Sequence, residues 1–511
     1  MHVPLTVHDH LARAEQVYGE RIGVVDEPDQ PAPSLGTLTY GELADRARQQ
    51  AAAWDRLGLD RGDRIAIVSH NSARMLVALW SVCAWGRVLV PINFRLGREE
   101  IRYIVEHSGA RVLLVDPELA DDLAGLDVEH TFVLGRDDEQ LTIPGGTPTE
   151  WERDETATAT INYTSGTTAK PKGVELTHRS LWLNAATLGW HAGVSDRDVY
   201  LHTLPLFHVN GWGMPFALAA MGVPQVILRK VDGDEILRRV RDHGVTLLSG
   251  APAVVAMVLD AARRWDEVPG RDRVRILVAG APPPSTTIER VETELGWEFM
   301  QLYGLTETSP LLTFNRTRQE WDALSAGDRA AKLMRAGAPA LGVQLRIGDD
   351  GQVLARGNHA LAAYWQQPDA SADVLEGGWF HTGDGGVLDH EGYLTIVDRK
   401  KDVIISGGEN VSSIEVEDAL HRHPAVAEVA VIGVPDPRWG ETVKALVVPA
   451  AGHEDVAESE LIAHCRERLA HYKCPTSIEL RAELPRTATG KLQKFRLREP
   501  YWEGRDRFVA G

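Results

Sequence analysis

Basic charge is the feature that this sequence most clearly lacks. It has 54 lysine and arginine residues against 73 aspartate and glutamate residues, and its formal net charge is −19 at pH 7. Nucleic-acid binding requires basic patches that neutralise phosphates, so this balance argues against a general nucleic-acid-binding protein. We therefore expect no nucleic-acid partner, while a small anion would still need a local basic groove.

Cysteines and long apolar runs are also scarce. The three cysteines, Cys83, Cys465 and Cys474, have neither metal-ligand spacing nor the number of a disulfide framework, which predicts reduced thiols in a cytoplasmic protein. The most apolar span, 75–85, is too short to cross a bilayer, so we expect a buried helix there and no transmembrane segment. No signal peptide is evident at the N-terminus, because a basic region followed by an apolar run is missing.

The sequence does contain the alternation of short apolar runs and amphipathic segments that is typical of α/β proteins. Its 511 residues predict two or three folded units. Thr39 and Glu42 form a capping-box pattern, which predicts a helix to about residue 57. Strands and helices are then predicted in alternation at 64–68, 72–85, 87–90, 98–107 and 111–115. This order predicts layered α/β subdomains with a largely parallel sheet.

The segments after residue 118 differ from this pattern in composition and in predicted secondary structure. Residues 119–155 are acidic and rich in Gly, Pro and Thr, which predicts irregular surface structure, and a second α/β series follows between 226 and 278. Short strands and turns from residue 342 indicate a small β-rich unit. Charged residues then interrupt two apolar strands, and a compact α+β pattern follows. We therefore divide the chain into a large domain, a hinge and a smaller C-terminal domain, at 1–398, 399–402 and 403–511.

The densest cluster of potential ligands lies at residues 163–174. Gly166 permits a close approach of the backbone to a ligand, and Lys172 adds positive charge. Oriented amides, small hydroxyls and lysines suit a polyphosphate, although a polar loop joining two strands is the plainer alternative. The sequence after Gly166 departs from a Walker A loop, so a nucleotide site of another type is indicated. The hydroxyl donors are Thr164, Ser165, Thr167 and Thr168.

This segment resembles the phosphate loop of the adenylate-forming superfamily, which includes acyl-CoA synthetases, adenylation domains of peptide synthetases and firefly luciferase. The superfamily's usual glycine after the two threonines is Ala169 here, and we expect a tuned loop that still functions. The resemblance runs in order from the Thr39 region to Lys491 through five motifs. It implies ATP, Mg²⁺ and CoA as cofactors, and a C-terminal domain that moves relative to the large AMP-binding and acyl-binding domain.

Residues 301–308 form the second motif of the resemblance. Taken alone, they favour a capped turn at the end of a strand. The resemblance implies that Tyr303 would stack on adenine, Thr306 would contact phosphate and Glu307 would hold magnesium. It also assigns Gly280 and Ala281 to the cofactor site.

A ribose site is implied by two further positions. Asp384 follows a glycine turn and matches the ribose-binding aspartate of the superfamily, because an ionised carboxylate binds two hydroxyls well. Arg399 matches the arginine beside the ribose. Without the resemblance, a surface turn or an ion pair would explain either residue.

The C-terminal motifs concern the chemistry itself. Lys491 looks like the lysine that reaches into the large domain and neutralises charge in the transition state, whereas a lysine so placed is normally a solvated surface residue. Lys401 matches the hinge, whose rotation would give adenylation first and thioester formation second. The resemblance implies a passage for pantetheine, although a β-hairpin turn is the alternative, at Gly407, Gly408 and Glu409.

The nature of the acid is indicated by residues 205–212. Peptide-synthetase domains carry an aspartate for the substrate's ammonium group, and His208 stands there instead, which disfavours an amino acid. The pattern is similar to fatty acyl-CoA synthetases, whose tryptophan gates the acyl tunnel; Trp212 fits that role and is also an ordinary core candidate. We assign His208 to catalysis. We also assign His208 to substrate binding, and there it is joined by Val209, Trp212 and Gly304.

The substrate predicted in this way is an apolar carboxylic acid: a medium or long fatty acid, or a bulky alicyclic or aryl acid. Two alternatives stay open, an acyl-AMP ligase that loads an acyl carrier protein and a non-catalytic relative that keeps the fold. The oligomeric state is equally open.

Overall fold

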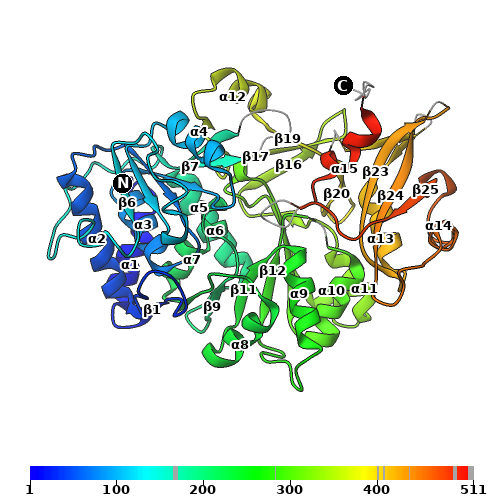
Figure 1. The fold of residues 1–511 in the computed structure, drawn as a ribbon, viewed down its shortest axis with the longest axis horizontal. Helices are drawn as coiled ribbons and strands as arrows, with labels where there is room; N and C mark the ends of the chain where they lie inside the picture. The colour runs from blue at the N-terminus through cyan, green and yellow to red at the C-terminus, as the bar shows by residue number, and fades with distance from the viewer. Residues whose placement is uncertain are drawn as a thin grey trace.

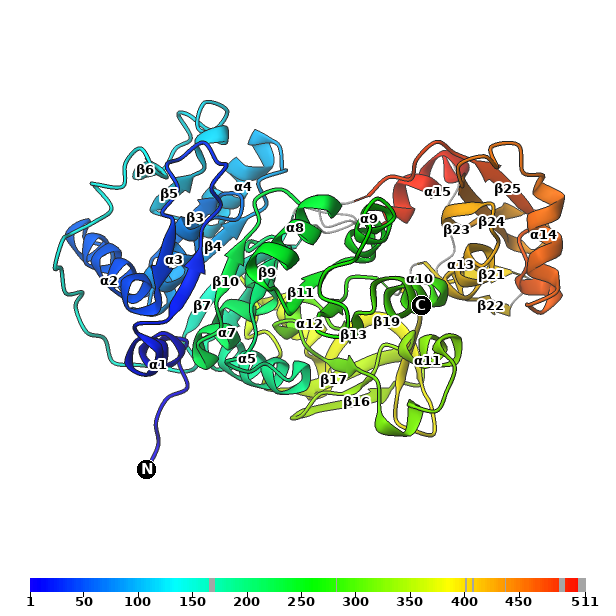
Figure 2. The ribbon, with the colours of Figure 1, turned by 90° about the horizontal axis from the view of Figure 1, so that it is seen from below.

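A computed structural model gives the fold for residues 1–164, 171–281, 283–399, 402–406, 409–436, 438–486 and 492–503. The elements up to β20 form a large body, and the elements from β21 onward gather at one end of it (Figures 1 and 2). This arrangement confirms the predicted α/β fold with a smaller α+β domain at the C-terminus.

The first sheet of the large body carries the phosphate-loop segment. Its strand order is β18-β8-β7-β4-β3-β5-β6, and β3, β4, β5 and β6 are parallel. Its strands are β3 (Arg64–Val68), β4 (Val88–Ile92), β5 (Val112–Val115), β6 (His130–Val133), β7 (Thr158–Thr164), β8 (Lys172–Thr177) and β18 (Ala363–Tyr364). The irregular structure predicted for 119–155 is wrong at β6, which is a short edge strand paired with β5.

The second sheet joins the middle of the large body to its beginning. Its order is β15-β14-β13-β12-β11-β9-β10-β1-β2, so the two N-terminal strands complete a sheet whose other strands come after residue 199. Its strands are β1 (Ile22–Val25), β2 (Thr37–Thr39), β9 (Tyr200–His202), β10 (Gln225–Ile227), β11 (Leu247–Gly250), β12 (Arg275–Val278), β13 (Glu298–Tyr303), β14 (Thr313–Asn315) and β15 (Ala338–Pro339).

Helices separate and cover the two sheets. One shared hydrophobic core lies between them and contains α1 (His8–Tyr18), α2 (Tyr40–Arg56), α3 (Ala73–Cys83), α5 (His178–Ala192) and α7 (Met214–Met221). The capping box at the start of α2 is present, with Thr39 and Glu42 bonded reciprocally as predicted. Every residue of α3 is buried, and no helix within the described residues is long and apolar enough to span a membrane.

The outer faces of both sheets are covered as well. Helix α4 (Arg98–Ser108) packs on the first sheet, and the second sheet is covered by α8 (Gly233–His243), α9 (Pro252–Ala262), α10 (Ser285–Arg290) and α11 (Ala326–Leu333). The result is a layered α/β/α/β/α body.

Buried polar contacts tie the two sheets together. Arg229, just after β10, donates to both carboxylate oxygens of Asp116, just after β5, at 2.9 and 2.8 Å. Within the second sheet and its covering helices, Arg239 on α8 donates to Glu27, just after β1, at 2.8 Å. Because these charges are buried and paired, removing one member of a pair would leave the other buried without a counter-charge.

A small antiparallel sheet closes the large body, as predicted from the texture after residue 342. It consists of β16 (Val343–Ile347), β17 (Gln352–Gly357), β19 (Phe380–Leu388) and β20 (Leu394–Arg399), with α12 (Pro368–Val374) nearby in sequence. The C-terminal part has its own sheet and core, formed by β21 (Ile404–Ser406), β22 (Glu409–Val411), β23 (Val426–Asp436), β24 (Gly440–Pro449), β25 (Ser477–Leu480), α13 (Ser413–His421), α14 (Glu458–Arg466) and α15 (Lys494–Trp502).

Candidate active site

The phosphate-loop segment joins two antiparallel strands. Thr164 at the end of β7 is paired with Lys172 at the start of β8, so both predicted ligands stand at the mouth of the hairpin. Residues 165–170 lie outside the described residues, and with them Ser165, Gly166, Thr167, Thr168 and Ala169. The Lys172 ammonium lies 4.7 Å from the centre of the Tyr364 ring, a cation–π contact that holds the lysine near the hairpin.

Tyr364 links this hairpin to the predicted magnesium ligand. Its hydroxyl donates to Glu307 Oε1 at 2.9 Å. Burial and the neighbouring Glu307 charge raise the pKa of Tyr364, so its hydroxyl stays protonated and continues to donate. Lys172 and Glu307, which are 135 positions apart, therefore meet on one tyrosine. No local pattern in the sequence indicated Tyr364.

The adenine and ribose candidates also come together. Tyr303, at the end of β13, donates its hydroxyl to Asp384 Oδ2 at 2.7 Å, and Asp384 is buried in β19. Asp384 is in turn the backbone partner of Arg399 in β20. An aromatic ring and a carboxylate thus stand side by side, which are the two groups that adenine and ribose require.

The remaining nucleotide candidates cluster at neighbouring strand ends. Gly280 and Ala281 follow β12, which is parallel to β13, and both are exposed. Carboxyl ends of adjacent parallel strands are where α/β sheets bind ligands. Thr306 begins the short helix η3 (Thr306–Thr308) directly after this edge.

Gly304 has a packing requirement in addition to its predicted substrate role. A Cβ at this position would lie 1.5 Å from the carbonyl oxygen of Pro310, a distance that no side chain tolerates. The glycine therefore allows the chain after β13 to fold back closely on itself, which places η3 beside the strand end.

The acyl candidates lie after β9, in a strand followed by a turn, as predicted. His208 is half-buried, whereas Val209 and Trp212 are buried. Trp212 belongs to the core between the two sheets, so the structure supports the core role that the sequence left open for it.

The C-terminal candidates lie largely outside the described residues. This applies to Lys401, Gly407, Gly408 and Lys491. The strands on either side of 407–408 form an antiparallel hairpin, with Ser406 paired to Glu409, and Glu409 is exposed. The hairpin that was the plainer alternative is thus present.

One polar contact between the domains was not indicated by the sequence. Asp418 Oδ1 on α13 accepts from the backbone N–H and the hydroxyl of Ser285, at 3.0 and 3.1 Å, and Arg422 donates to the same hydroxyl at 3.0 Å. Ser285 begins α10, whose own cap residue, Pro284, supplies no side-chain hydrogen bond. The small domain therefore caps a helix of the large domain.

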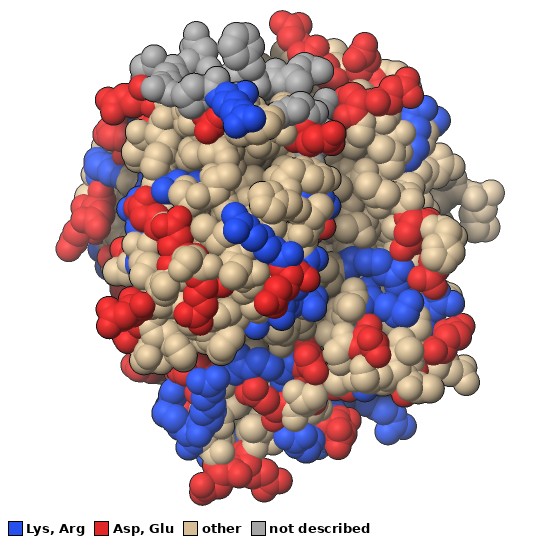
Figure 3. Space-filling model, turned by 90° about the vertical axis from the view of Figure 1, so that its right-hand side faces the viewer, with Lys and Arg blue, Asp and Glu red and all other residues tan. Residues whose placement is uncertain are grey.

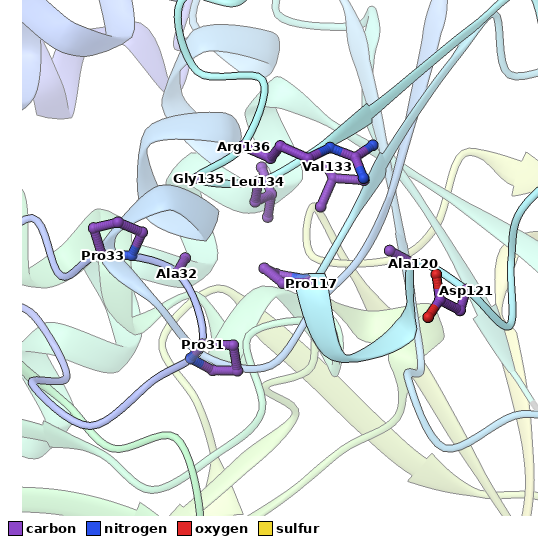
Figure 4. Close-up of a pocket in the computed structure, with 10 residues that line it drawn as sticks. All are labelled: Pro31, Ala32, Pro33, Pro117, Ala120, Asp121, Val133, Leu134, Gly135 and Arg136. Atoms are coloured by element: carbon purple, nitrogen blue, oxygen red, sulfur yellow. The ribbon is translucent and has the colours of Figure 1, made fainter.

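The surface charge and the cavity described next do not indicate a second nucleotide site. On the face that presents the small domain, acidic and basic side chains are interspersed (Figure 3). A cavity of about 280 Å³ lies near the end of β6, and none of the site candidates lines it (Figure 4). Its walls are mostly apolar side chains, with Asp121 and Arg136 as the ionisable groups, which does not fit a polyphosphate.

Comparison with known proteins agrees with this geometry. Residues 12–365 match the family model described as AMP-binding enzyme, and residues 415–491 match that of the AMP-binding enzyme C-terminal domain. The relative named probable acyl-activating enzyme 5, peroxisomal, from Arabidopsis thaliana is 36% identical over 97% of this chain and 96% of its own length. The 4-hydroxybutyrate–CoA ligase 2 of Metallosphaera sedula is 37% identical over 96% of this chain and 93% of its own length.

A solved structure shows the same fold with a reaction intermediate bound. The o-succinylbenzoate CoA synthetase from Bacillus subtilis, in complex with its acyl-adenylate intermediate, is 31% identical. The similarity covers 96% of this chain and 97% of that one, with a TM-score of 0.81. The same enzyme has also been solved with ATP and a magnesium ion.

Proposed function

The chain belongs to the family of AMP-binding enzymes and is an AMP-forming acid–thiol ligase, and we propose that its substrate is an apolar carboxylic acid. The proposed reaction activates the acid as acyl-AMP with release of pyrophosphate, and then transfers the acyl group to the thiol of CoA with release of AMP. Two sets of contacts support the proposal. Tyr303 is hydrogen-bonded to Asp384. Tyr364 contacts both Lys172, through its ring, and Glu307, through its hydroxyl.

The described residues fit a bound nucleotide. We propose that Tyr303, Gly280 and Ala281 surround adenine, that Asp384 accepts from the ribose hydroxyls, and that Lys172 lies near the phosphates. The backbone of Arg399 is fixed beside Asp384 by the strand pairing, which is consistent with a ribose role for this arginine. Proposed phosphate contacts outside the described residues are Ser165, Gly166, Thr167 and Thr168.

The donor set around Glu307 fits magnesium, since a carboxylate oxygen is the kind of ligand that this ion prefers. When bound, the ion would neutralise charge on the phosphate oxygens. Tyr364 orients the Glu307 carboxylate through its hydroxyl, and Thr306 stands next in the chain for a phosphate contact.

The first half-reaction forms a bond between a carboxylate oxygen of the acid and the α-phosphorus of ATP, and breaks the bond from that phosphorus to pyrophosphate. We propose that His208 and Gly304 line the site of the carboxylate and that Lys491 neutralises the developing charge. In the second half-reaction, the CoA thiol gives its proton to solvent and its sulfur attacks the acyl carbonyl, and the bond from the acyl carbon to the phosphate oxygen breaks so that AMP leaves. We propose that Lys401 is the hinge about which the small domain rotates between the two half-reactions. We also propose that the path of the thiol is flanked by Gly407, Gly408 and Glu409.

An apolar acid is favoured because no acidic side chain stands at position 208 to bind an ammonium group. Val209 and Trp212 are apolar and belong to the core between the two sheets, and we propose that this part of the core forms the wall of the acid site. An acyl carrier protein as thiol acceptor is the alternative for the second half-reaction. We propose the cytoplasm as the compartment, because the described cysteines, Cys83, Cys465 and Cys474, are free thiols.

The test is acid-dependent release of pyrophosphate from MgATP across fatty, aryl, polycyclic and amino acids, with and without CoA. Release with an apolar acid, together with acyl-CoA formation when CoA is present, is the expected result. Release without any CoA product would indicate a carrier-protein acceptor. Absence of release from the native chain and from the Ala169→Gly variant would contradict the proposal.

A further inference from the structure

The acyl segment follows a left-handed path for five residues in succession, 209–213, which we call the acyl turn. The φ angles are 41°, 48°, 60°, 60° and 75° for Val209, Asn210, Gly211, Trp212 and Gly213. This region is unfavourable for residues with a Cβ atom, and most of all for a β-branched residue such as Val209. Such a conformation persists only where the surroundings impose it.

The chain just before the acyl turn is held by Asn71, a buried residue between β3 and α3. Its Oδ1 accepts from the backbone N–H of Leu206 at 2.8 Å. Its Nδ2 donates to the carbonyl oxygens of Leu204 and His202, at 2.8 and 3.1 Å. The start of the acyl turn is therefore anchored to the first sheet.

The end of the acyl turn is held by Asn184, a fully buried residue on α5. Its Nδ2 donates to the carbonyl oxygen of Trp212, and its Oδ1 accepts from the backbone N–H of Leu311, both at 3.3 Å. Leu311 lies three residues after η3, the short helix that contains Thr306 and Glu307. One side chain thus joins the acyl turn to the nucleotide motif.

The absence of a side chain at Gly213 leaves space for the Asn184 amide. A Cβ at position 213 would lie 2.4 Å from Asn184 Nδ2, so only glycine leaves room for the amide. A third bond runs from Asn210 Nδ2 to Thr160 Oγ1 at 3.2 Å, on the strand β7 that leads into the phosphate loop. The acyl turn is therefore bonded directly to the strand that leads into the phosphate loop and, through Asn184, to the chain that follows η3.

We propose that Asn184 is a positioning residue that fixes the acyl turn against the nucleotide motif and thereby sets the affinity and selectivity for the acid. The inference rests on the proposed function, since it concerns the acid of that reaction. Asn184 itself acts through Trp212 and Leu311. An in-line attack on phosphorus requires the reacting atoms to be aligned closely, so a loosened turn would weaken productive binding of the acid.

The test compares two buried asparagines. Asn184→Leu keeps the number and branching of the side-chain heavy atoms and removes both bonds. The matched control is Asn315→Leu on β14: Asn315 is also buried and donates to two backbone carbonyls, of Lys332 and Arg335, at 3.0 and 2.9 Å, away from the acyl turn.

Asn184→Leu is expected to raise the KM for the acid about tenfold, with the KM for ATP changed less than about twofold, because one buried hydrogen bond to the turn is lost. It should also flatten the differences in kcat/KM among acids of the panel. Asn315→Leu should lower the melting temperature comparably and leave the KM for the acid within about twofold of the native value. Equal kinetic changes in both variants would overturn the inference.

A second variant keeps the inference testable if Asn184→Leu does not fold. Gly213→Ala displaces the Asn184 amide from the other side and should raise the KM for the acid in the same way. In the double variant the two increases in the KM for the acid should not add, because both substitutions remove the same contact between Asn184 and the acyl turn. Additive effects would contradict the coupling, whereas a native chain that activates no acid would instead refute the proposed function.

Discussion

Two interfaces in this molecule are built from different kinds of polar contact. Between the two sheets of the large domain, Arg229 and Asp116 form a bidentate pair whose side chains are only 4% and 2% exposed. Between the large and small domains, Ser285 meets Asp418 and Arg422, whose side chains are 13% and 45% exposed. A buried pair that parts leaves uncompensated charges, whereas an exposed pair that parts is solvated at once.

The difference bears on the movement of the small domain that we propose. The sheet interface holds the acyl turn and the strand ends of the nucleotide site in fixed relation. The domain interface near Ser285 depends on a helix cap that water can replace. This is the kind of contact expected where a domain changes orientation between two half-reactions.

The largest effect is expected when the buried arginine of the sheet interface, Arg229, is replaced. Arg229→Met should lower the free energy of unfolding of the large domain by about 3–5 kcal/mol, because Asp116 is left buried without its partner. Urea denaturation followed by circular dichroism measures this. In the exposed control, Arg102→Met, which disrupts pairs with Glu99 and Glu106, the change should stay within about 0.5 kcal/mol. Similar losses in both variants would contradict the account.

The next effect concerns chemistry carried by the small domain. Lys491→Ala should lower the rate of adenylate formation by about 10²–10³-fold, because a positioned charge on the transition state is lost, while thiolysis of supplied acyl-adenylate survives. The control is Lys230→Ala, a large-domain lysine that is 73% exposed and 3.8 Å from Glu118. An equal loss of both half-reactions, or of neither, would exclude the proposed role.

Acid should destabilise the large domain through its buried histidines. Burial lowers the pKa of His10, His178 and His202 to about 4. The unfolded chain binds these protons near pH 6.5, so the folded state loses stability as the pH falls from about 6.5 toward about 4.

The single-residue test of this effect is His202→Gln, because His202 Nε2 lies 2.9 Å from Gln225 Oε1 and a neutral amide replaces the titrating ring. The variant should reduce the loss of stability between about pH 7 and about pH 4.5 by about 2 kcal/mol. Urea unfolding at the two pH values measures it. An unchanged loss would show that His202 binds its proton equally well in both states.

The smallest expected effect is at the domain interface. Asp418→Ala should change the ratio of the two half-reaction rates by about two- to fivefold, since one partly buried charge-assisted cap is lost, with unfolding changed by about 1 kcal/mol. Glu428→Ala, which removes an exposed pair with Arg486 inside the small domain, is the control and should leave the ratio unchanged. Equal slowing of both half-reactions by Asp418→Ala would indicate a merely structural contact.

Local signals explain what the sequence predicted well. The capping box at Thr39 depends on residues three apart, and the strands from 64 to 115 follow from short apolar runs. The edge strand β6 was missed because its four residues are recognisable mainly by their pairing with β5. The return of β1 and β2 to the second sheet likewise depends on contacts distant in sequence.

The sequence predicts the candidate site as a set of motifs, but it does not predict the contacts between the residues of those motifs. The Tyr364–Glu307 bond joins residues 57 positions apart, and the Asp418–Ser285 cap joins residues 133 apart. Gly211 and Gly213 hint at an unusual backbone, yet the left-handed conformation of Val209 and Trp212 arises from tertiary hydrogen bonds that no local pattern encodes.

The most direct test of the central claim is a rapid-quench time course of a single turnover with enzyme in excess over a radiolabelled apolar acid, in the presence of MgATP and CoA. The account predicts that acyl-AMP rises first and decays as acyl-CoA and AMP appear together. Formation of acyl-CoA with release of ADP, or without a preceding acyl-AMP phase, would contradict it.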